Sequence, residues 1–221
     1  MYTGPIVVYG AGGLGREVFQ LLEKIDSIEK CWTLCGFIDD NLPKQTRCGY
    51  YSVLENGAFL NSLPEPNRVT DSNNVVIAIG DPTIKKQVAD SLTNPFLTYP
   101  VIIHPSVEIE KELRANIGEG SIITAGNLLT VDIKIGRHVL LNLGCTVGHD
   151  VQIGDYCSVM PGVNISGNVT LEEGVFVGTG AKILNNVTIG ARTKIGAGAV
   201  VTQSLPPDCT AVGVPARIVK Q

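Results

Sequence analysis

An aliphatic residue recurs at every sixth position of this 221-residue chain from Ile117 to Val201. All fifteen positions in this frame are Ile, Leu or Val, without a slip. If these residues filled about a quarter of positions at random, such a run would be on the order of a one-in-a-billion event. A fixed short period indicates a repeat architecture, and the rest of the chain is interpreted around it.

Each hexad predicts one flat side of a three-sided coil. The fourth residue after each aliphatic position is small or branched almost throughout, and glycine directly follows the aliphatic position seven times. Inward aliphatic side chains, with glycine and polar residues at the corners, fit a triangular prism. Fifteen hexads make five coils, stacked about 4.8 Å apart as parallel strands. The Pro206-Pro207 break and the segment 209–219 are expected to cap one end against edge-to-edge association.

Composition and charge exclude several classes of protein. A net charge of −4 offers no basic surface for nucleic acid. No apolar run reaches transmembrane length and no signal peptide is evident, so a cytoplasmic protein without a membrane partner is expected. The six cysteines fit neither a disulfide scaffold nor a spaced zinc site, and no metal is expected.

Residues 1–100 predict a parallel α/β domain that is about half of a dinucleotide-binding (Rossmann) fold. Apolar runs and helical spacing are the basis of this prediction, and 47–68, which lacks clean periodicity, is expected to be a helix fragment and surface loop. The expected strands cover 5–9, 34–38, 75–79 and a short stretch near 97–102, and the helices cover 16–24 and 83–92. The repeat domain then takes residues 101–221, opening with an irregular coil over 103–116.

The motif Gly10-Ala11-Gly12-Gly13-Leu14-Gly15 stands between the first strand and helix. Glycines there let the backbone approach a phosphate, and the helix N-terminus supplies free N–H groups. Asp39 and Asp40 end the second strand, where an acid can accept hydrogen bonds from ribose or base. An NAD-dependent oxidoreductase is the obvious rival, but the second mononucleotide-binding half is missing and no hydride-transfer site is visible.

The repeat resembles that of the hexapeptide acyltransferases, whose left-handed parallel β-helices form homotrimers. Gly213-Val214-Pro215-Ala216 resembles their usual C-terminal ending. With the glycine-rich domain in front, the whole chain is similar to the nucleotide-aminosugar N-acetyltransferases of the bacillosamine pathway type and their sialic-acid O-acetyltransferase relatives. The resemblance implies acetyl-CoA-dependent N-acetylation of a nucleotide-linked 4-amino-4,6-dideoxy sugar, with UDP as the favoured nucleotide.

His149 and Asp150 look like the catalytic His–acid pair of that subgroup. An attacking amine must lose a proton, and histidine, with an ordinary pKa near 6.5, suits that task. The carboxylate, from Asp150 or from an adjacent subunit, would fix the imidazole. Backbone amides near Gly167 or Gly148 are the candidate donors to the oxyanion. No serine or cysteine stands beside the histidine as a nucleophile, so direct transfer in a ternary complex is expected.

The resemblance also implies the binding residues. The acetyl-CoA candidates are Ser158, Thr179, Ala197, Gly213 and Pro215, and the nucleotide-sugar candidates are Gly12, Gly13, Leu14, Asp39, Asp40 and Gly80. Many hexapeptide enzymes carry a long loop that helps to form the acceptor site. The unbroken frame here leaves acceptor binding to the N-terminal domain.

Three alternatives remain open. The first is a sugar O-acetyltransferase of the sialic-acid type, and the second is a non-enzymatic trimeric module that binds nucleotide sugars. The third is a carbonic-anhydrase-like zinc site, which needs three converging histidines. His138 and His149 sit at different phases of the repeat, and His104 at the domain junction is expected to be structural.

Overall fold

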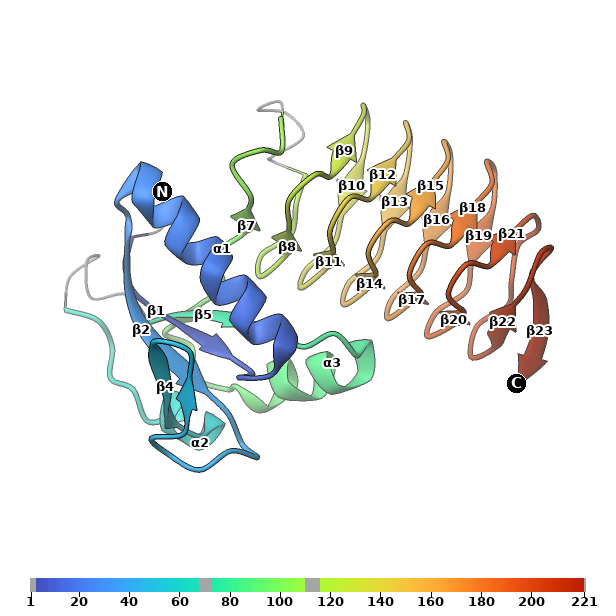
Figure 1. Ribbon diagram of the computed structural model, residues 1–221. Coiled ribbons are helices and arrows are strands. Elements are labelled where there is room, and N and C mark those ends of the chain that lie inside the picture. The colour runs from blue at the N-terminus through green and yellow to red at the C-terminus, as the bar shows by residue number, and fades with distance from the viewer. Residues whose placement is uncertain (1–2, 68–72, 110–115, 221) are drawn as a thin grey trace. The chain divides into compact units, whose positions relative to one another are not determined.

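The computed structural model describes residues 3–67, 73–109 and 116–220, which fold as two compact units (Figure 1). The first unit takes residues 1–80 and 84–100, and the second takes 81–83 and 101–221. Among the described residues, no helix has both the length and the apolar character needed to cross a membrane. The expected fold class, a half-Rossmann α/β domain followed by a parallel β-helix, is confirmed.

The first unit is built on a six-stranded sheet of order β3-β4-β2-β1-β5-β6. Its strands are β1 (Gly4–Tyr9), β2 (Trp32–Ile38), β3 (Arg47–Cys48), β4 (Tyr51–Glu55), β5 (Asn73–Ile77) and β6 (Leu97–Thr98). The helices are α1 (Gly13–Glu29), α2 (Gly57–Asn61) and α3 (Pro82–Ser91). The central strand β1 lies parallel to β2 and to β5, as a mononucleotide-binding half requires.

Two expectations for this unit are wrong. The sheet is mixed rather than parallel, because β3 runs antiparallel to β4. The segment 47–68 holds this hairpin, and β4 adds to β2 with Val53 opposite Phe37. A side chain on Gly36 would come within 2.8 Å of the Ser52 carbonyl oxygen, so a glycine in β2 permits this pairing. The single strand expected near 97–102 is in fact two strands. Leu97–Thr98 (β6) belongs to this sheet, whereas Ile102–Ile103 (β7) belongs to the solenoid.

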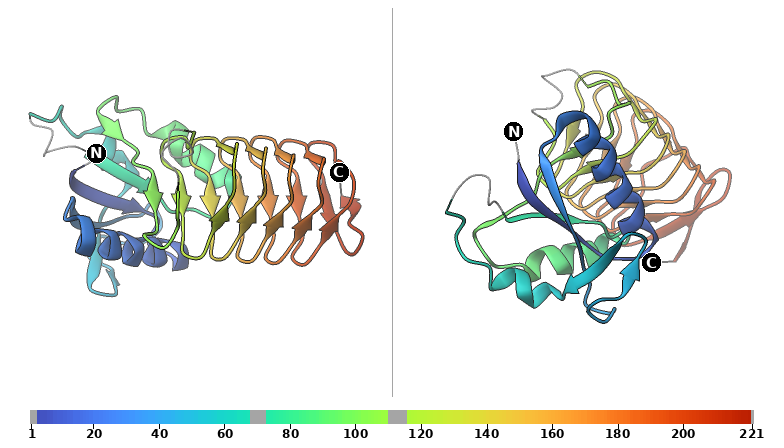
Figure 2. Two further views of the ribbon diagram at one scale, coloured as in Figure 1. Left: turned by 90° about the horizontal axis from the view of Figure 1, so that it is seen from above. Right: turned by 60° about the vertical axis from the view of Figure 1, so that its left-hand side comes forward.

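The second unit is a solenoid whose three faces are parallel sheets, apart from an antiparallel last strand (Figures 1 and 2). The eight-stranded face holds β7, β8 (Ile122–Ile123), β11 (Leu140–Leu141), β14 (Ser158–Val159), β17 (Phe176–Val177), β20 (Lys194–Ile195), β22 (Thr210–Val212) and β23 (Arg217–Lys220). The five-stranded face holds β9 (Leu128–Leu129), β12 (Thr146–Val147), β15 (Asn164–Ile165), β18 (Lys182–Ile183) and β21 (Val200–Val201). The four-stranded face holds β10 (Lys134–Ile135), β13 (Gln152–Ile153), β16 (Thr170–Leu171) and β19 (Thr188–Ile189).

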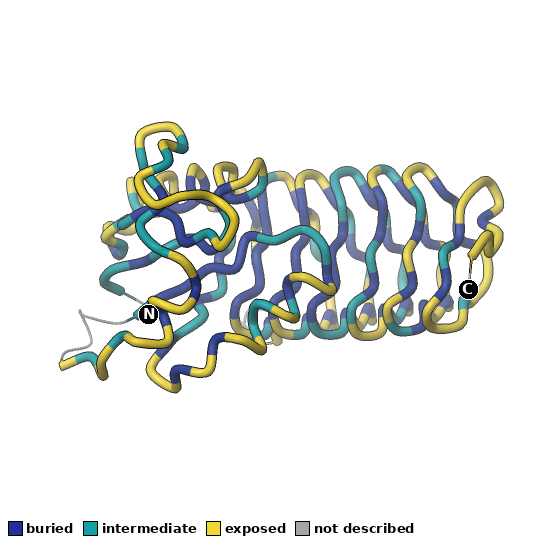
Figure 3. Tube along the Cα trace, turned by 90° about the horizontal axis from the view of Figure 1, so that it is seen from below, coloured by how far each residue is buried: buried dark blue, intermediate teal, exposed yellow. Residues whose placement is uncertain are grey.

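The six-residue frame is confirmed by the strand register. Paired residues in successive coils are 18 positions apart, as for Leu141 opposite Val159 and Val147 opposite Ile165. Nearly all the frame residues are buried in one continuous core, together with the residues four positions later. The burial colouring along the solenoid shows this regular alternation of buried and exposed residues (Figure 3).

The glycines directly after the frame residues are needed because successive coils lie so close. A side chain at Gly154 would come within 2.8 Å of the Glu173 backbone nitrogen, and one at Gly178 within 2.6 Å of the Ala197 nitrogen. The same clash with the next coil's backbone arises at Gly118, Gly136, Gly148 and Gly190. Real side chains do not make such contacts, so these positions set how tightly the coils stack.

A second set of positions, three residues after the frame, turns the corners in the left-handed backbone region. Every sixth residue from 120 to 198 has φ between 52° and 75°, whichever residue occupies it. Because this conformation is costly for most L-residues, glycine, asparagine and aspartate predominate there. We name the three columns the glycine corner (Gly126, Gly144, Gly162, Gly180, Gly198), the Asp/Asn corner (Asp132, Asp150, Asn168, Asn186) and the mixed corner (Gly120, His138, Tyr156, Gly174, Arg192).

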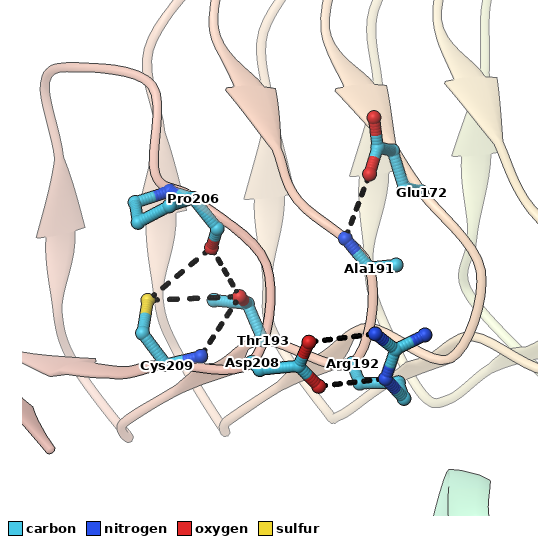
Figure 4. Close-up of polar contacts among 7 residues, drawn as sticks. All are labelled: Glu172, Ala191, Arg192, Thr193, Pro206, Asp208 and Cys209. Carbon is cyan, nitrogen blue, oxygen red and sulfur yellow. Dashed lines mark hydrogen bonds and ion pairs between the residues drawn. The ribbon is translucent and has the colours of Figure 1, made fainter. Parts of the chain in front are cut away.

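Both ends of the solenoid depart from the 18-residue coil. Ile102 pairs with Ile122, 20 positions on, in the first coil, whose residues 110–115 lie outside the described part. Lys194 pairs with Thr210, only 16 positions on, in the last. The buried Thr193 hydroxyl donates to the Pro206 carbonyl (2.7 Å) and accepts from the Cys209 N–H, which bridges the shortened coil (Figure 4). Strand β23 then pairs antiparallel with β22 as the expected cap.

The two glycine classes predict losses of stability of different size on substitution. Gly154→Ala places a methyl group against the next coil's backbone and should lower the free energy of unfolding by about 2–3 kcal/mol. Gly162→Asn, at an open left-handed corner, should cost no more than about 1 kcal/mol. Chemical denaturation followed by circular dichroism measures both. Equal losses in the two variants would contradict the distinction.

Candidate active site

His149 and Asp150 lie on the Asp/Asn corner, between the five-stranded and four-stranded faces. The His149 Nδ1 and Asp150 Oδ2 atoms are 2.8 Å apart, and their side chains are 64% and 58% exposed. An ionised carboxylate only accepts, so Nδ1 carries the proton and Nε2 presents a lone pair. Asp150 has φ of 60°, the left-handed corner conformation. The sequence-predicted pair is thus joined by a hydrogen bond, with the proton-accepting nitrogen left open.

The His149 ring packs over Gly167, which lies one coil further on. A side chain at Gly167 would lie 2.5 Å from His149 Nε2, so the imidazole packs directly over this glycine. Among the described residues, no acceptor takes the Gly167 N–H, which leaves it available beside Nε2. The Gly148 N–H, by contrast, donates to the Ile165 carbonyl at 2.9 Å. Gly148 is therefore wrong as an oxyanion donor, because coil stacking already uses its amide.

The other two histidines lie elsewhere. His138 is buried at the mixed corner and stacks on the Tyr156 ring, with centroids 5.4 Å apart. His104 is also buried, and its Nδ1 contacts the Ser106 hydroxyl at 2.7 Å in the turn after β7. The described residues contain no group of three or more His, Cys, Asp or Glu side chains placed to hold a metal ion.

The acetyl-CoA candidates fall in two exposed places and one buried place. Thr179 and Ala197 are exposed one coil apart beside the glycine corner, where the Gly198 N–H donates to the Thr179 carbonyl. Gly213 and Pro215 form the exposed turn between β22 and β23. Ser158 is fully buried on the eight-stranded face, so the structure does not place it at the surface with the other four candidates.

The glycine corner is a feature that the sequence analysis overlooked. All three corners have the same backbone conformation, yet only this one lacks side chains throughout. A side chain at Gly144, Gly162, Gly180 or Gly198 would meet nothing within 4 Å, so the fold's packing does not demand glycine there. The signal was present as glycine at every eighteenth position from 126 to 198.

In the first unit, the glycines of the motif serve two different purposes, one in packing and one in leaving space at the α1 N-terminus. Gly15 is required by the fold, because a side chain there would overlap the Gly10 carbonyl oxygen at 1.8 Å. Gly12 and Gly13, at the start of α1, face open space. No side chain caps α1, whose first N–H groups therefore remain available to an anion. A side chain added at Gly80 would lie 3.9 Å from the Leu14 side chain, so Gly80 has room there for a larger residue.

Asp39 and Asp40 act as loop anchors in this structure. Asp39 accepts from the N–H groups of Ala11 (2.8 Å), Asn41 and Leu42, which ties the strand end to the glycine motif. Asp40 accepts from the Gly57 N–H and the Tyr9 hydroxyl. Burial and the nearby Asp40 carboxylate raise the pKa of Tyr9 well above its ordinary value, so this hydroxyl keeps its proton. Each carboxylate is thus already fixed in place.

The chain matches two family models and several solved structures. Residues 5–92 match the PglD N-terminal domain, and 168–203 match the bacterial transferase hexapeptide repeats. WeeI from Acinetobacter baumannii is 34% identical over 98% of this chain and 100% of its own, with a TM-score of 0.83. No curated protein sequence matches the chain.

Two further structures resemble it over almost their whole length. A histidine-to-asparagine variant of perosamine N-acetyltransferase from Caulobacter crescentus, in complex with CoA and GDP-perosamine, is 29% identical, with 99% of this chain and 98% of that one covered and a TM-score of 0.85. The acetyltransferase domain of PglB from Neisseria gonorrhoeae, with acetyl coenzyme A, is 28% identical, with 98% and 100% covered and a TM-score of 0.85.

Together the solenoid, the glycine-motif domain and these relatives define the class, a hexapeptide-repeat acyltransferase with a left-handed β-helix. Within that class, the chain belongs to the nucleotide-aminosugar N-acetyltransferases that carry a PglD-type N-terminal domain. Acetyl-CoA is the co-substrate of this enzyme class.

The division within the glycine motif predicts separate effects on binding and folding. Gly13→Val should weaken nucleotide-sugar binding at least about tenfold by blocking close approach to the α1 N-terminus, with little change in thermal stability. Gly15→Ala should instead lower the melting temperature, because its methyl group overlaps the Gly10 carbonyl. Calorimetric titration and thermal melts of both variants check this. Unchanged binding in folded Gly13→Val would contradict it.

Because the His149 ring packs over Gly167, a side chain at position 167 should impair catalysis without unfolding the protein. Gly167→Ala should displace the imidazole and reduce kcat by about 10²-fold, since small misplacements of a catalytic group are costly. Gly174→Ala, at a left-handed position of the mixed corner, serves as a stability control away from the site. Steady-state kinetics and circular dichroism measure the pair. Wild-type kcat in Gly167→Ala would show that activity does not depend on the packing of the His149 ring over Gly167.

Proposed function

We propose that this enzyme transfers the acetyl group of acetyl-CoA to the amino group of a nucleotide-linked 4-amino-4,6-dideoxy sugar, with UDP as the favoured nucleotide. The observation that carries the proposal is the His149–Asp150 pair, whose ring packs over Gly167, a residue with an N–H that has no acceptor among the described residues. The GDP-perosamine complex of the C. crescentus relative supports a nucleotide-linked amino sugar as acceptor.

His149 is the general base in this proposal. The sugar amine attacks the thioester carbonyl, and Nε2 takes the proton that the nitrogen loses as the C–N bond forms. Asp150 holds the Nδ1–H and stabilises the imidazolium. The Gly167 N–H donates to the oxyanion of the tetrahedral intermediate. When that intermediate collapses, the C–S bond breaks and the imidazolium returns its proton to the thiolate of coenzyme A.

The nucleotide end of the acceptor binds at the glycine motif. The diphosphate lies against Gly12, Gly13 and Leu14 at the α1 N-terminus, where free N–H groups and positive potential favour it. Asp39 and Asp40 hold the loop that faces the ribose and base, and Gly80 keeps the space beyond the end of β5 clear. In this proposal the first unit binds the nucleotide of the acceptor, and the solenoid binds the acetyl donor.

A homotrimer completes this site. The His149–Asp150 pair lies on a convex corner, and the apolar side chains of Leu128, Val131 and Leu184 nearby are 67%, 55% and 42% exposed. Acyl transfer benefits from a site that excludes water, which an exposed corner alone does not provide. A second copy that places its glycine corner, with Thr179 and Ala197, opposite the first copy's Asp/Asn corner supplies the missing wall.

Thiol release from acetyl-CoA with a panel of UDP-, dTDP- and GDP-linked 4-amino sugars tests the reaction. His149→Ala should lower kcat by about 10²- to 10⁴-fold, the usual contribution of a general base. Asp132→Asn, one coil earlier on the same corner, is the matched control and should keep wild-type turnover. If no amino sugar releases coenzyme A, the N-acetyl assignment fails. If His149→Ala turns over normally, another base is at work.

A further inference from the structure

A buried tyrosine at the end of β1 contacts one of the two acids that follow β2. Tyr9 is 3% exposed, and its ring packs in the core of the first unit. Its hydroxyl donates to Asp40 Oδ2, and the Gly57 N–H donates to Asp40 Oδ1 at 2.8 Å. These contacts come from the last residue of β1 and the first residue of α2 (Figure 1). The Asp40 carboxylate is therefore fixed by two different elements.

Gly57 leaves the space that this arrangement needs. A side chain at Gly57 would come within 2.5 Å of the Tyr9 hydroxyl oxygen and 3.0 Å of its ring. Real side chains do not make such contacts, so a larger residue there would displace the hydroxyl that reaches Asp40. Two positions far apart in the sequence are thus fitted to one carboxylate, although Asp40 itself is exposed.

The two acids after β2 differ in how many hydrogen bonds they can still accept. Asp39 is half-buried, and its Oδ1 accepts from the N–H groups of Asn41 and Leu42 at 2.9 and 3.0 Å. Asp39 Oδ2 accepts from the Ala11 N–H at 2.8 Å. Each carboxylate oxygen can accept about two hydrogen bonds. Among the described residues, Asp39 therefore keeps one open position, whereas Asp40 keeps one on each oxygen.

This state of Asp40 suits a ligand that donates two neighbouring hydrogen bonds. An exposed carboxylate is ordinarily solvated, and holding it in one orientation costs side-chain entropy. Fixing it before the ligand arrives lowers the cost of binding a group that donates to it. A ribose presents two adjacent hydroxyl donors, at its 2′ and 3′ carbons, which match one open position on each oxygen. A 2′-deoxyribose presents only one.

We propose that Tyr9 is a positioning residue that lets Asp40 select acceptors with a ribonucleotide over acceptors with a 2′-deoxyribonucleotide. This inference rests on the nucleotide site of the proposed function. Asp39 ties the end of β2 to the glycine motif through the Ala11 N–H, and the ribose is expected at that strand end. Among the candidate acceptors, UDP- and GDP-linked sugars carry the 2′-hydroxyl and dTDP-linked sugars lack it. The inference thus narrows the class of substrate.

Calorimetric titration of the full-length protein with a nucleoside diphosphate and its 2′-deoxy form tests this proposal. UDP with dUDP, and GDP with dGDP, isolate the 2′-hydroxyl whichever base the site prefers. The wild type should bind the ribonucleotide about tenfold more tightly than its deoxy form, as expected for a hydrogen bond to a charged acceptor. Tyr9→Phe keeps the ring and should reduce this ratio to about two or less, with unchanged affinity for the deoxy form.

Two further variants make the test independent of one substitution. Gly57→Ala should reduce the same ratio, because its methyl group displaces the Tyr9 hydroxyl. Tyr51→Phe removes a hydroxyl that bonds to Glu23 instead, so this matched control should keep the wild-type ratio. In turnover, Tyr9→Phe should raise KM for a UDP-linked acceptor and leave kcat unchanged, since Tyr9 acts on binding alone.

The outcomes separate this proposal from the proposed function. A tenfold preference that survives in Tyr9→Phe would overturn the role of Tyr9, and so would equal weakening of both nucleotide forms. A wild type that binds the two forms equally would leave the nucleotide site intact and overturn only the selection by Asp40. If the wild type binds neither form, the nucleotide site of the proposed function fails, and this proposal fails with it. Thermal melts that match the wild type confirm that each variant is folded.

Discussion

The close approach of one coil's backbone to the next is the constraint on which the solenoid depends. Glycine directly after the frame residue brings the peptide units of successive coils into contact, and this same stacking consumes most backbone amides in inter-coil hydrogen bonds. The N–H groups of Gly167 and, one coil later, of Asn185 take no part in that ladder among the described residues. The open amide under His149 is therefore a regular product of the way the coils stack.

Two sets of residues are thus separated along every hexad. The frame residue and the one four positions later fill the core, while the residue three positions after the frame turns the corner with φ near 60°. At Asp150 this conformation accompanies the hydrogen bond that the preceding His149 ring donates to the carboxylate. A conformation imposed by the geometry of the prism thereby accompanies the contact between the two residues of the proposed catalytic pair.

The sequence predicted the solenoid well because each hexad encodes its own side of the prism through short-range spacing. The β3–β4 hairpin was missed because its position depends on Val53 pairing with Phe37, a contact across distant segments that leaves no local period. His149 was predicted from its neighbour and its family pattern, but its packing over Gly167 arises from residues a full coil apart. Gly148 failed as an oxyanion donor for a related reason, since only the stacked structure reveals that its amide is occupied.

The separation of corners from core has an evolutionary consequence. The side chains of the Asp/Asn corner are exposed, so they can be replaced with little effect on the folding energy, provided that the new residue tolerates the left-handed conformation. The mixed corner is more restricted, because His138 and Tyr156 are buried there. A lineage built on this prism can therefore change its ligand chemistry corner by corner, while its interior stays under a separate and much stricter selection.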